Sequence, residues 1–402
     1  MGNTKAELLE FIKAQKNISL DFVEKARDFQ GDIYLFGAGS HLPFAVGFMQ
    51  KYGLRVKGIL DSSKSGKYQR SSYKSFYDGD IPIIKFDEFL LGEDAKKNCW
   101  FVISAPSAEE AIRKTIARYF PEETIFSFET ELYVDYFSLL DVEAYRAYLL
   151  DHWDGFLELY DALADGKSRD TLTSVLKGRL SGELSYFRQC CVSDQYYPSD
   201  IIRFSKDEVM VDLGAYEGET LLELIPRCPD YQAAYCFEPD VNLLPQLEKV
   251  KEQQAERKKR VYVVPKGAWD CSTTLKFSTA GTLEGSSHIM DDCEGERSYA
   301  IETAAVDEVV KEPISYMKMD IEGSELRALY GAETQIKTNR PKLAVCVYHR
   351  NEDILDIWNY LRSLTPEYQF YLRHHTTAGT ETVLYAVPIV RRPVDVWSVR
   401  RF

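Results

Sequence analysis

The sequence lacks the features that would place a protein across a membrane. No apolar run reaches the roughly 18 residues that a membrane-spanning helix needs. The opening segment, MGNTKAELLEFIKAQKN, is polar and amphipathic, without the apolar core of a signal peptide. We therefore expect neither a membrane span nor a cleaved leader, and we predict a cytoplasmic protein.

Paired cysteines are also missing. The chain has eight cysteines, and none of them forms a CxxC pair. Several lie in predicted strands, where a reduced thiol serves as a small buried hydrophobic group. We expect free thiols rather than a disulfide framework or a zinc site.

Positive charge is scarce. The 49 lysines and arginines are outnumbered by 63 aspartates and glutamates, which gives a formal net charge of −14. Because binding to phosphates needs a basic surface, this balance argues against a nucleic-acid partner. The 402 residues are too many for one ordinary core, so at least two domains are expected.

Hydrophobic periodicity divides the chain into four segments: an N-terminal helix (1–29), a small Rossmann-like domain (30–135), a helical connector (136–195) and a second α/β domain (196–402). In both α/β domains strands alternate with helices, which implies parallel sheets. Only a turn separates the last two predicted strands of the chain, so these should form an antiparallel hairpin.

The first α/β domain contains a glycine turn, Gly37-Ala-Gly39, after a predicted strand, and Asp61 ends the next strand. This arrangement looks like half of a dinucleotide site, but Pro43 lies near where the third glycine would fall. Two roles remain open for this domain. It could bind a nucleotide-linked sugar, or it could serve for docking and oligomerisation, which leaves a homo-oligomer open.

A second glycine turn follows the apolar run Val209–Leu213. Gly214 and Gly218 let backbone N–H groups approach a ligand at a helix N-terminus. The spacing is GxxxG, not the GxGxxG of dinucleotide sites. S-adenosylmethionine presents a sulfonium instead of a pyrophosphate, and Asp212 favours such a cationic ligand. The alternative is an ordinary strand-to-helix turn.

The next two predicted strands also end in candidate ligand contacts. Glu238 ends the second strand, where a carboxylate can accept hydrogen bonds from a ribose, and Pro239 follows it. The alternative for Glu238 is a helix cap. Gly267, Ala268 and Trp269 follow the third strand, and the indole could flank an adenine ring or pack in the core.

Candidate reactive groups follow the fourth and fifth predicted strands. Asp320 and Glu322 lie outside the fourth strand, where two close carboxylates can share a proton, bind substrate hydroxyls or hold a divalent cation. His349 ends the fifth strand and could act as a base near neutral pH. The alternatives are helix capping for the carboxylates and a purely structural histidine.

Candidate substrate contacts are Ser287, His288 and Lys318. The first two belong to residues 271–297, which are rich in Gly, Ser, Thr and acids, and we predict an irregular loop there that could cover the site. His374 and His375 have no spaced partner for a metal, so we expect surface or substrate-rim residues.

Five motifs in order, VDLGAYEGET, CFEPD, KGAWD, KMDIEGSE and PKLAVCVYHR, resemble the FkbM family of S-adenosylmethionine-dependent methyltransferases over about 196–390. The resemblance implies a class I methyltransferase fold with a seven-stranded sheet whose last strand is antiparallel. It implies that Glu238 contacts the ribose of the cofactor, that Gly267, Ala268 and Trp269 lie near the adenine, and that Asp320 and Glu322 lie near the transferred methyl. The methionine portion would contact Asp212, Gly214, Ala215, Tyr216, Gly218 and Thr220.

The resemblance also implies O-methylation, most often of a sugar hydroxyl on a glycan or natural product. Asp320 or His349 could remove the hydroxyl proton, or a divalent cation on Asp320 and Glu322 could lower its pKa. Two alternatives remain open: a non-catalytic scaffold that binds cofactor or sugar nucleotide, and methylation of a protein or peptide.

Overall fold

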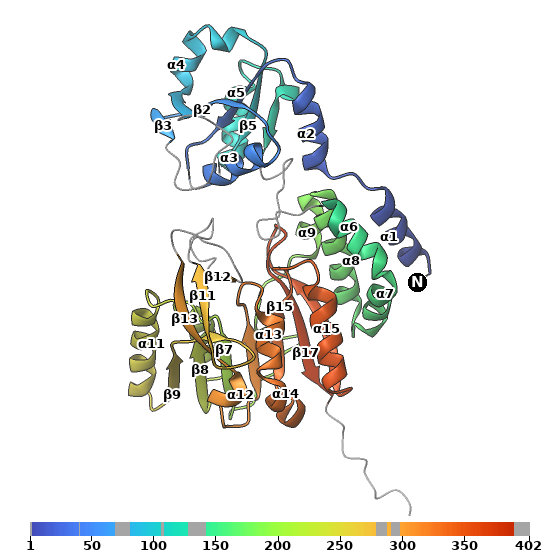
Figure 1. Ribbon diagram of the computed structural model, residues 1–402, viewed down its shortest axis with the longest axis vertical. Coiled ribbons are helices and arrows are strands. Elements are labelled where there is room, and N and C mark those ends of the chain that lie inside the picture. Colours follow the sequence, from blue (N-terminus) through green and yellow to red (C-terminus); the bar gives the residue numbers. More distant parts are fainter. Residues whose placement is uncertain are drawn as a thin grey trace, which may run out of the picture.

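The computed structural model describes residues 2–39, 41–68, 81–105, 108–127, 142–278, 288–290 and 298–389. The predicted α/β class is confirmed, because the described chain contains mixed sheets covered by helices (Figure 1). In Figure 1 the N-terminal sheet lies at the top, and the larger C-terminal sheet lies below it.

The N-terminal unit is built on a six-stranded sheet of order β3-β4-β2-β1-β5-β6. Its central strand, β1, pairs in parallel with β2 and β5, while β3 pairs with β4 in the antiparallel sense. The strands are β1 (Asp32–Phe36), β2 (Val56–Asp61), β3 (Gly66–Tyr68), β4 (Ile81–Lys85), β5 (Cys99–Ile103) and β6 (Ile125–Ser127). The helices of this unit are α2 (Ile18–Asp28), α3 (Leu42–Lys51), α4 (Phe86–Leu91) and α5 (Glu109–Ile116).

The segment predicted as one N-terminal helix contains two, α1 (Gly2–Ala14) and α2, and they pack in different places. Leu8 and Ile12 of α1 are buried with the large C-terminal sheet, whereas Phe22 of α2 is buried in the N-terminal unit. Asn17 stands between the helices: its side chain accepts the Ser19 N–H at 2.9 Å and caps α2.

Four helices follow the N-terminal unit: α6 (Val142–Asp151), α7 (Trp153–Ala162), α8 (Gly166–Ser181) and α9 (Leu184–Cys190). The first three bury apolar side chains such as Tyr145, Phe156 and Leu176 in the same core as the large sheet and α1. These helices are therefore packed as part of the C-terminal unit.

The C-terminal unit is built on a seven-stranded sheet of order β16-β17-β15-β14-β7-β8-β9. The strands are β7 (Val209–Leu213), β8 (Ala233–Phe237), β9 (Arg260–Val264), β14 (Tyr316–Met319), β15 (Lys342–Cys346), β16 (Tyr368–His374) and β17 (Thr382–Pro388). Strand β17 is antiparallel to both β15 and β16, and the other pairs are parallel. Strand β7 lies between β8 and β14, so the strand order reverses there, and open sheets bind ligands outside the carboxyl ends of such strands.

Side chains of β7 alternate between two cores. Val211 and Leu213 face the core that includes α6–α8, whereas Met210 faces the core formed with Leu221 and Leu247. Such runs of apolar residues are typical of parallel strands buried on both faces. The covering helices are α10 (Glu219–Arg227), α11 (Leu244–Glu256), α12 (Val306–Val309), α13 (Glu325–Tyr330), α14 (Glu333–Asn339) and α15 (Asp353–Leu364).

The prediction that the stretch 271–297 is an irregular loop is wrong for part of its length. The stretch contains β11 (Thr274–Ser278) and β12 (His288–Met290), which join β10 (Gly267–Ala268) and β13 (Ser298–Ala304) in a small sheet of order β10-β13-β11-β12. The alternating apolar residues Leu275 and Phe277 explain the strand, which the polar composition of the stretch concealed. Ser287 lies outside the described residues, and the side chain of His288 is not described.

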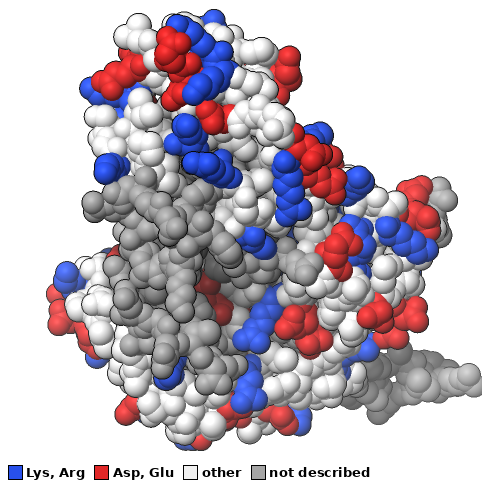
Figure 2. Space-filling model, turned by 45° about the horizontal axis from the view of Figure 1, so that its top comes forward, with Lys and Arg blue, Asp and Glu red and all other residues white. Residues whose placement is uncertain are grey.

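Two further features are the distribution of charge on the surface and the character of the helices. On the face shown in Figure 2, acidic and basic side chains are mixed over both the upper and lower parts of the molecule. Among the described helices, none combines the length and apolar character of a membrane span.

Candidate active site

The glycine turn after β7 fits closely against the end of β14. Gly214 has a φ of +79°, and a Cβ there would lie 1.9 Å from the carbonyl oxygen of Asp320. Gly218, with a φ of +94°, is the residue before α10. Only glycine satisfies both demands at Gly214, so this turn brings the chain after β7 against the chain after β14.

A cavity of about 390 Å³ lies at the carboxyl ends of β7, β8 and β14. It brings together ten of the residues predicted from the sequence: Gly214, Tyr216, Thr220, Glu238, Pro239, Gly267, Ala268, Lys318, Asp320 and Glu322. The remaining lining residues, which the sequence did not indicate, are Tyr196, Glu219, Glu223, Phe237, Asp240, Leu243, Ile321 and Ser324.

Five predicted residues whose side chains the structure describes are not among those lining the cavity. Asp212, Ala215 and Trp269 are buried, and the Trp269 ring packs against the Arg327 guanidinium at 5.0 Å. Trp269 therefore follows the core alternative. Gly218 lies against α11, and His349 lies behind the acids of the site.

Asp212 is the counterion of a buried lysine. The Lys318 ammonium lies 3.1 Å from Asp212 Oδ1 and donates to the Gly214 carbonyl at 2.6 Å. Burial alone would lower the pKa of Lys318, but the carboxylates of Asp212 and Asp320 raise it above its usual value. The ion pair stabilises the glycine turn through the hydrogen bond from Lys318 to Gly214. Asp212 therefore supports the cavity through Lys318 and does not line it.

Glu238 links the turns after β7 and β8. Its Oε2 accepts the Tyr216 N–H at 3.0 Å, and its Oε1 accepts the Asp240 N–H at 2.8 Å. Burial raises the pKa of Glu238 to about 7, although the two N–H donors act in the opposite direction. Each oxygen keeps lone-pair capacity for a ligand hydroxyl in the cavity that it lines.

Two residues lining the cavity have strained backbones. Tyr216 has a φ of +49° and Glu322 a φ of +55°, both in the left-handed region. For a residue other than glycine this conformation costs roughly 1–2 kcal/mol. Strain of this kind collects at functional sites, where surrounding contacts hold it in place.

Asp320 is held by two tyrosines, one at each carboxylate oxygen. Its Oδ2 accepts the Tyr196 hydroxyl at 2.7 Å, and its Oδ1 accepts the Tyr348 hydroxyl at 3.1 Å. Burial acts to raise its pKa, but Lys318, His349 and the two hydroxyls lower it below its usual value. Asp320 is therefore a carboxylate at neutral pH, facing the cavity.

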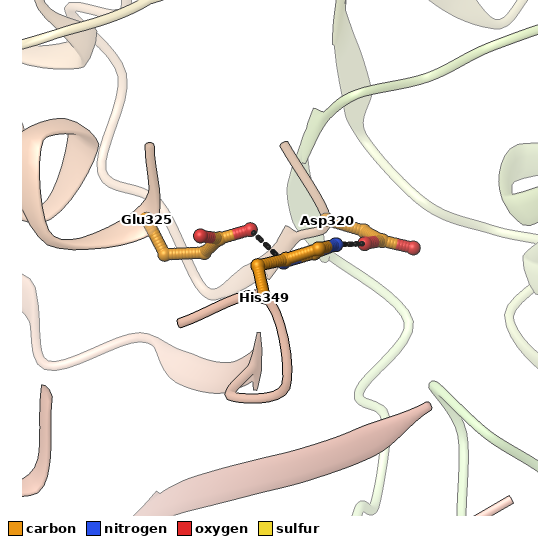
Figure 3. A group of neighbouring side chains, drawn as sticks. All are labelled: Asp320, Glu325 and His349. Carbon is orange, nitrogen blue, oxygen red and sulfur yellow. Dashed lines mark ion pairs between the residues drawn. The ribbon is translucent and has the colours of Figure 1, made fainter. Parts of the chain in front are cut away.

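His349 lies between carboxylates, with one ring nitrogen toward each side (Figure 3). Nδ1 is 3.0 Å from Glu325 Oε1, and Nε2 is 3.5 Å from Asp320 and 3.4 Å from Glu322. Burial would lower the pKa of His349, but these carboxylates raise it to about 10. The predicted role of general base does not fit an imidazole that is already protonated at neutral pH.

Glu322 is the cavity carboxylate that holds a proton most readily. Burial, together with the charges of Asp320 and Glu325, raises its pKa to about 8, while His349 opposes this rise. Glu322 therefore exchanges a proton near neutral pH, and it does so beside Asp320, which stays ionised. Neighbouring acids whose pKa values are pushed apart are typical of sites that move protons.

The acids of the site do not favour a metal. Among the described residues, two groups bring three ligand atoms within 4.8 Å of one another, Asp320–Glu325–His349 and Asp320–Cys346–Glu381, and Glu322 is in neither. In the first group the protonated imidazole already balances the carboxylates (Figure 3). In the second, burial raises the pKa of the Cys346 thiol well above its usual value, which disfavours the thiolate that a metal would bind.

The cavity is acidic. Among its described lining residues six are aspartate or glutamate, and Lys318 is the one basic residue. Such a surface favours a ligand with positive charge and disfavours the pyrophosphate of a dinucleotide. This observation agrees with the GxxxG spacing of the glycine turn.

Comparison with known families decides the class of the domain. Residues 212–368 match the model of the methyltransferase FkbM domain. This part of the chain is therefore similar in sequence to the methyltransferase FkbM domain. The matched region starts at Asp212 in β7 and ends at the first residue of β16, so the predicted resemblance is confirmed and almost all lining residues of the cavity fall inside it.

The similarity to one solved structure extends beyond residues 212–368 to almost the whole chain. The crystal structure of methyltransferase FkbM from Methylobacillus flagellatus KT matches with 26% identity and a TM-score of 0.66, over 95% of this chain and 93% of that one. An rRNA methylase from Streptococcus thermophilus matches with 13% identity, over 47% of this chain and 89% of its own, at a TM-score of 0.30. The comparison with curated proteins finds no match.

Proposed function

We propose that the protein transfers a methyl group from S-adenosylmethionine to a hydroxyl oxygen of a carbohydrate, on a glycan or natural product. The observation that carries the proposal is an acid-lined cavity beside the glycine turn of a region that matches the FkbM domain. S-adenosylmethionine brings a sulfonium and an ammonium, and the acidic lining suits both charges.

The lining residues divide naturally among the parts of this cofactor. The turn at Gly214 and Tyr216 lines the cavity where the methionine portion would lie, and Glu238 presents carboxylate lone pairs for the ribose hydroxyls. The N–H groups of this turn donate within the protein, from Gly214 to the Phe237 carbonyl and from Tyr216 to Glu238, so the turn offers shape and not free N–H donors. Gly267 and Ala268 line the cavity with little side-chain bulk, which leaves room for the adenine. When bound, the cofactor supplies the methyl group on a positively charged sulfur.

The protein must then position the acceptor hydroxyl and remove its proton. Asp320 is suited to take that proton, because it faces the cavity as a carboxylate, with two tyrosine hydroxyls fixing its oxygens. His349 stays protonated and stabilises the acids around it. The chain supplies these charges itself, so the mechanism needs no divalent cation.

Two measurements test this function. Titration calorimetry with S-adenosylhomocysteine should show binding at one site, and transfer of labelled methyl to a panel of glycans should show turnover that survives chelation. Binding without transfer would favour the scaffold alternative, and transfer to peptides alone would reject the carbohydrate acceptor. Loss of turnover on chelation would contradict the metal-free mechanism.

For the N-terminal unit we propose docking or oligomerisation rather than nucleotide binding. Asp61, the acid that a ribose would need, accepts N–H groups from Ala38, Ser63 and Lys64, each at 2.9 Å. Its carboxylate is thus engaged by its own loop. Light scattering of the full chain tests for a homo-oligomer, and calorimetry with nucleotide-linked sugars should show no binding.

A further inference from the structure

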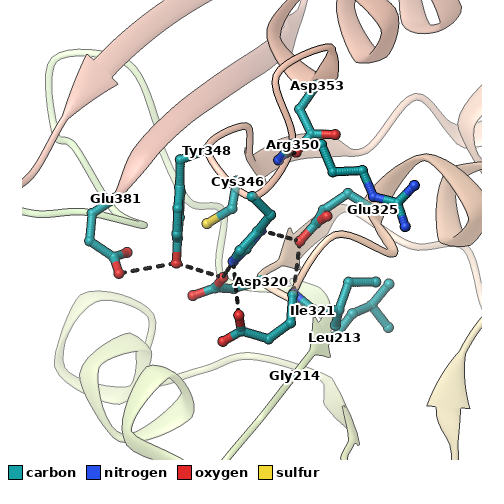
Figure 4. Close-up of polar contacts among 12 residues, drawn as sticks. Leu213, Gly214, Asp320, Ile321, Glu325, Cys346, Tyr348, Arg350, Asp353 and Glu381 are labelled. Carbon is teal, nitrogen blue, oxygen red and sulfur yellow. Dashed lines mark hydrogen bonds and ion pairs between the residues drawn. The ribbon is translucent and has the colours of Figure 1, made fainter. Parts of the chain in front are cut away.

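Five side chains, two of which line the cavity, form a closed ring of hydrogen bonds. Tyr348 donates toward both Asp320 Oδ1 and Glu381 Oε1, each at 3.1 Å, and Figure 4 shows its hydroxyl between the two carboxylates. On the other side of the ring, the Gln195 amide nitrogen donates to Glu381 Oε2 and, at 3.0 Å, to the Tyr196 hydroxyl oxygen. The Tyr196 hydroxyl in turn donates to Asp320 Oδ2. The ring thus connects the cavity carboxylate to the turn before β17.

The ring is one proton short when both of its carboxyls are ionised. It contains five hydrogen bonds. Its neutral donors offer four hydrogens, two from the Gln195 amide and one from each tyrosine. The single hydroxyl hydrogen of Tyr348 cannot serve both Asp320 and Glu381 at once. A fifth hydrogen, carried by one of the carboxyls, completes the ring.

Glu381 is the place for that hydrogen. Its backbone is strained, with a φ of +64°, and its side chain is half-buried at the end of the ring away from the cavity. Burial and the charge of Asp320 raise the pKa of Glu381 to about 7, while Gln195, Tyr348 and His349 act to lower it. Asp320 is the opposite case, because Lys318 and His349 hold it ionised.

Transfer of a proton along the ring, a proton relay, would also compensate for the low proton affinity of Asp320. A carboxyl whose pKa is lowered binds a proton poorly, so Asp320 alone cannot retain the proton of an acceptor hydroxyl. A second carboxyl with higher proton affinity, joined to it through one hydroxyl, removes that difficulty. Glu381 occupies this position.

We propose that the ring carries away the proton of the acceptor hydroxyl and that Glu381 is its final carrier. The inference rests on the proposed methyl transfer. As the acceptor oxygen bonds to the methyl carbon, the carbon–sulfur bond breaks with its electron pair left on sulfur, and the hydroxyl proton passes to Asp320. That proton then moves to Tyr348 as the hydrogen of Tyr348 moves to Glu381, which releases it to water.

The variant Glu381→Gln keeps the shape of the side chain but cannot take up a proton. We expect kcat to fall by about tenfold to a hundredfold, on the scale of general acid–base effects, with unchanged affinity for S-adenosylhomocysteine. The rise of kcat with pH near 7 should disappear. Tyr348→Phe, which interrupts the ring at one atom, should give the same changes.

Glu312→Gln is the matched control. Glu312 accepts a tyrosine hydroxyl too, from Tyr235 at 2.7 Å, but it lies outside the residues lining the cavity. It should leave kcat and the pH profile unchanged. If wild type transfers methyl and Glu381→Gln does so at the same rate and with the same pH profile, the relay is rejected while the function stands. If wild type transfers no methyl, the proposed function itself fails.

Infrared spectroscopy tests the stored proton without an acceptor. The carbonyl band of a protonated carboxyl should titrate near pH 7 in wild type and in Glu312→Gln, and its amplitude should drop by one group in Glu381→Gln. Glu238, Glu322 and Asp353 also have pKa values raised to about 7 or 8, so the difference between variants is what isolates Glu381. An unchanged band in Glu381→Gln would overturn the inference.

Discussion

His349 is a single cation placed among three carboxylates, and this makes it important for stability as well as for the site. The pKa of the folded state, about 10, lies above the ordinary value of 6.5. The stabilisation is therefore complete below about pH 6.5 and is lost as pH rises through about 10. The molecule should be more stable in neutral than in alkaline solution.

Replacing His349 by Gln should destabilise the fold by roughly 3–5 kcal/mol, because buried carboxylates lose their cation. The decline of stability between neutral and alkaline pH should also become shallower. Urea unfolding at several pH values measures both effects. His152→Gln is the control, since His152 is exposed. An unchanged alkaline slope in His349→Gln would show that the imidazole is not the protonated group.

Glu238 provides a second test at the residue scale. In Glu238→Gln one amide N–H₂ group must face a backbone N–H of Tyr216 or Asp240, and the charged acceptor for a ribose hydroxyl is lost. A hydrogen bond to a charged group contributes about 1.5–3 kcal/mol. We expect at least a tenfold loss of affinity for S-adenosylhomocysteine by calorimetry. Glu248→Gln on the surface of α11 should bind like wild type, and equal affinity in both variants would contradict the assignment.

At the scale of elements, the turn between β7 and α10 has no room for a side chain at Gly214. Gly214→Ala puts a Cβ 1.9 Å from the Asp320 carbonyl oxygen at a φ of +79°. The left-handed conformation alone costs about 1–2 kcal/mol, and the clash adds to it. We expect a lower melting temperature and no detectable binding of S-adenosylhomocysteine.

Gly166→Ala is the control for that substitution. Gly166 begins α8, and a Cβ there would meet nothing within 4 Å. Alanine also has the higher helix propensity, so stability should be unchanged or slightly raised. If both variants behave alike, the contact between the two strand ends does not restrict the turn.

Elements with local signals could be predicted, and contacts between distant segments could not. The strand at Val209–Leu213 is continuously apolar, and the glycines after it mark the turn, so the cofactor side of the cavity was predictable from sequence. Tyr196 and Glu381 lie outside every motif, and only the fold brings them to Asp320. His374, predicted at the surface or substrate rim, is fully buried against Phe187, because its strand is covered by α8 and α9.

On the scale of the whole molecule, the two units have separate cores. The core around Leu35 and Ile59 belongs to the N-terminal sheet, whereas the core around Leu213 and Val345 unites the large sheet with α1 and α6–α8. The candidate cofactor cavity lies in the second unit. Ligand binding should therefore stabilise one unit directly and leave the other as it was.

Differential scanning calorimetry should show two transitions, with S-adenosylhomocysteine raising one of them. At a hundred times the dissociation constant the gain is about 2.7 kcal/mol for the unit that binds. Glu238→Gln at the same ligand concentration should show a smaller shift of that transition. A single transition that the ligand raises as a whole would mean that the units unfold together.

The position of α1 has a consequence for the order in which the protein is made. Leu8 and Ile12 pack with residues of α6 and α8, and Gln15 accepts a hydrogen bond from Arg146 at 2.6 Å through its carbonyl oxygen. The N-terminal sheet is thus an insertion within the unit that carries the candidate cofactor cavity. During synthesis α1 leaves the ribosome long before α6 and α8, with which it packs. The inserted domain can therefore fold while the apolar face of α1 is still exposed.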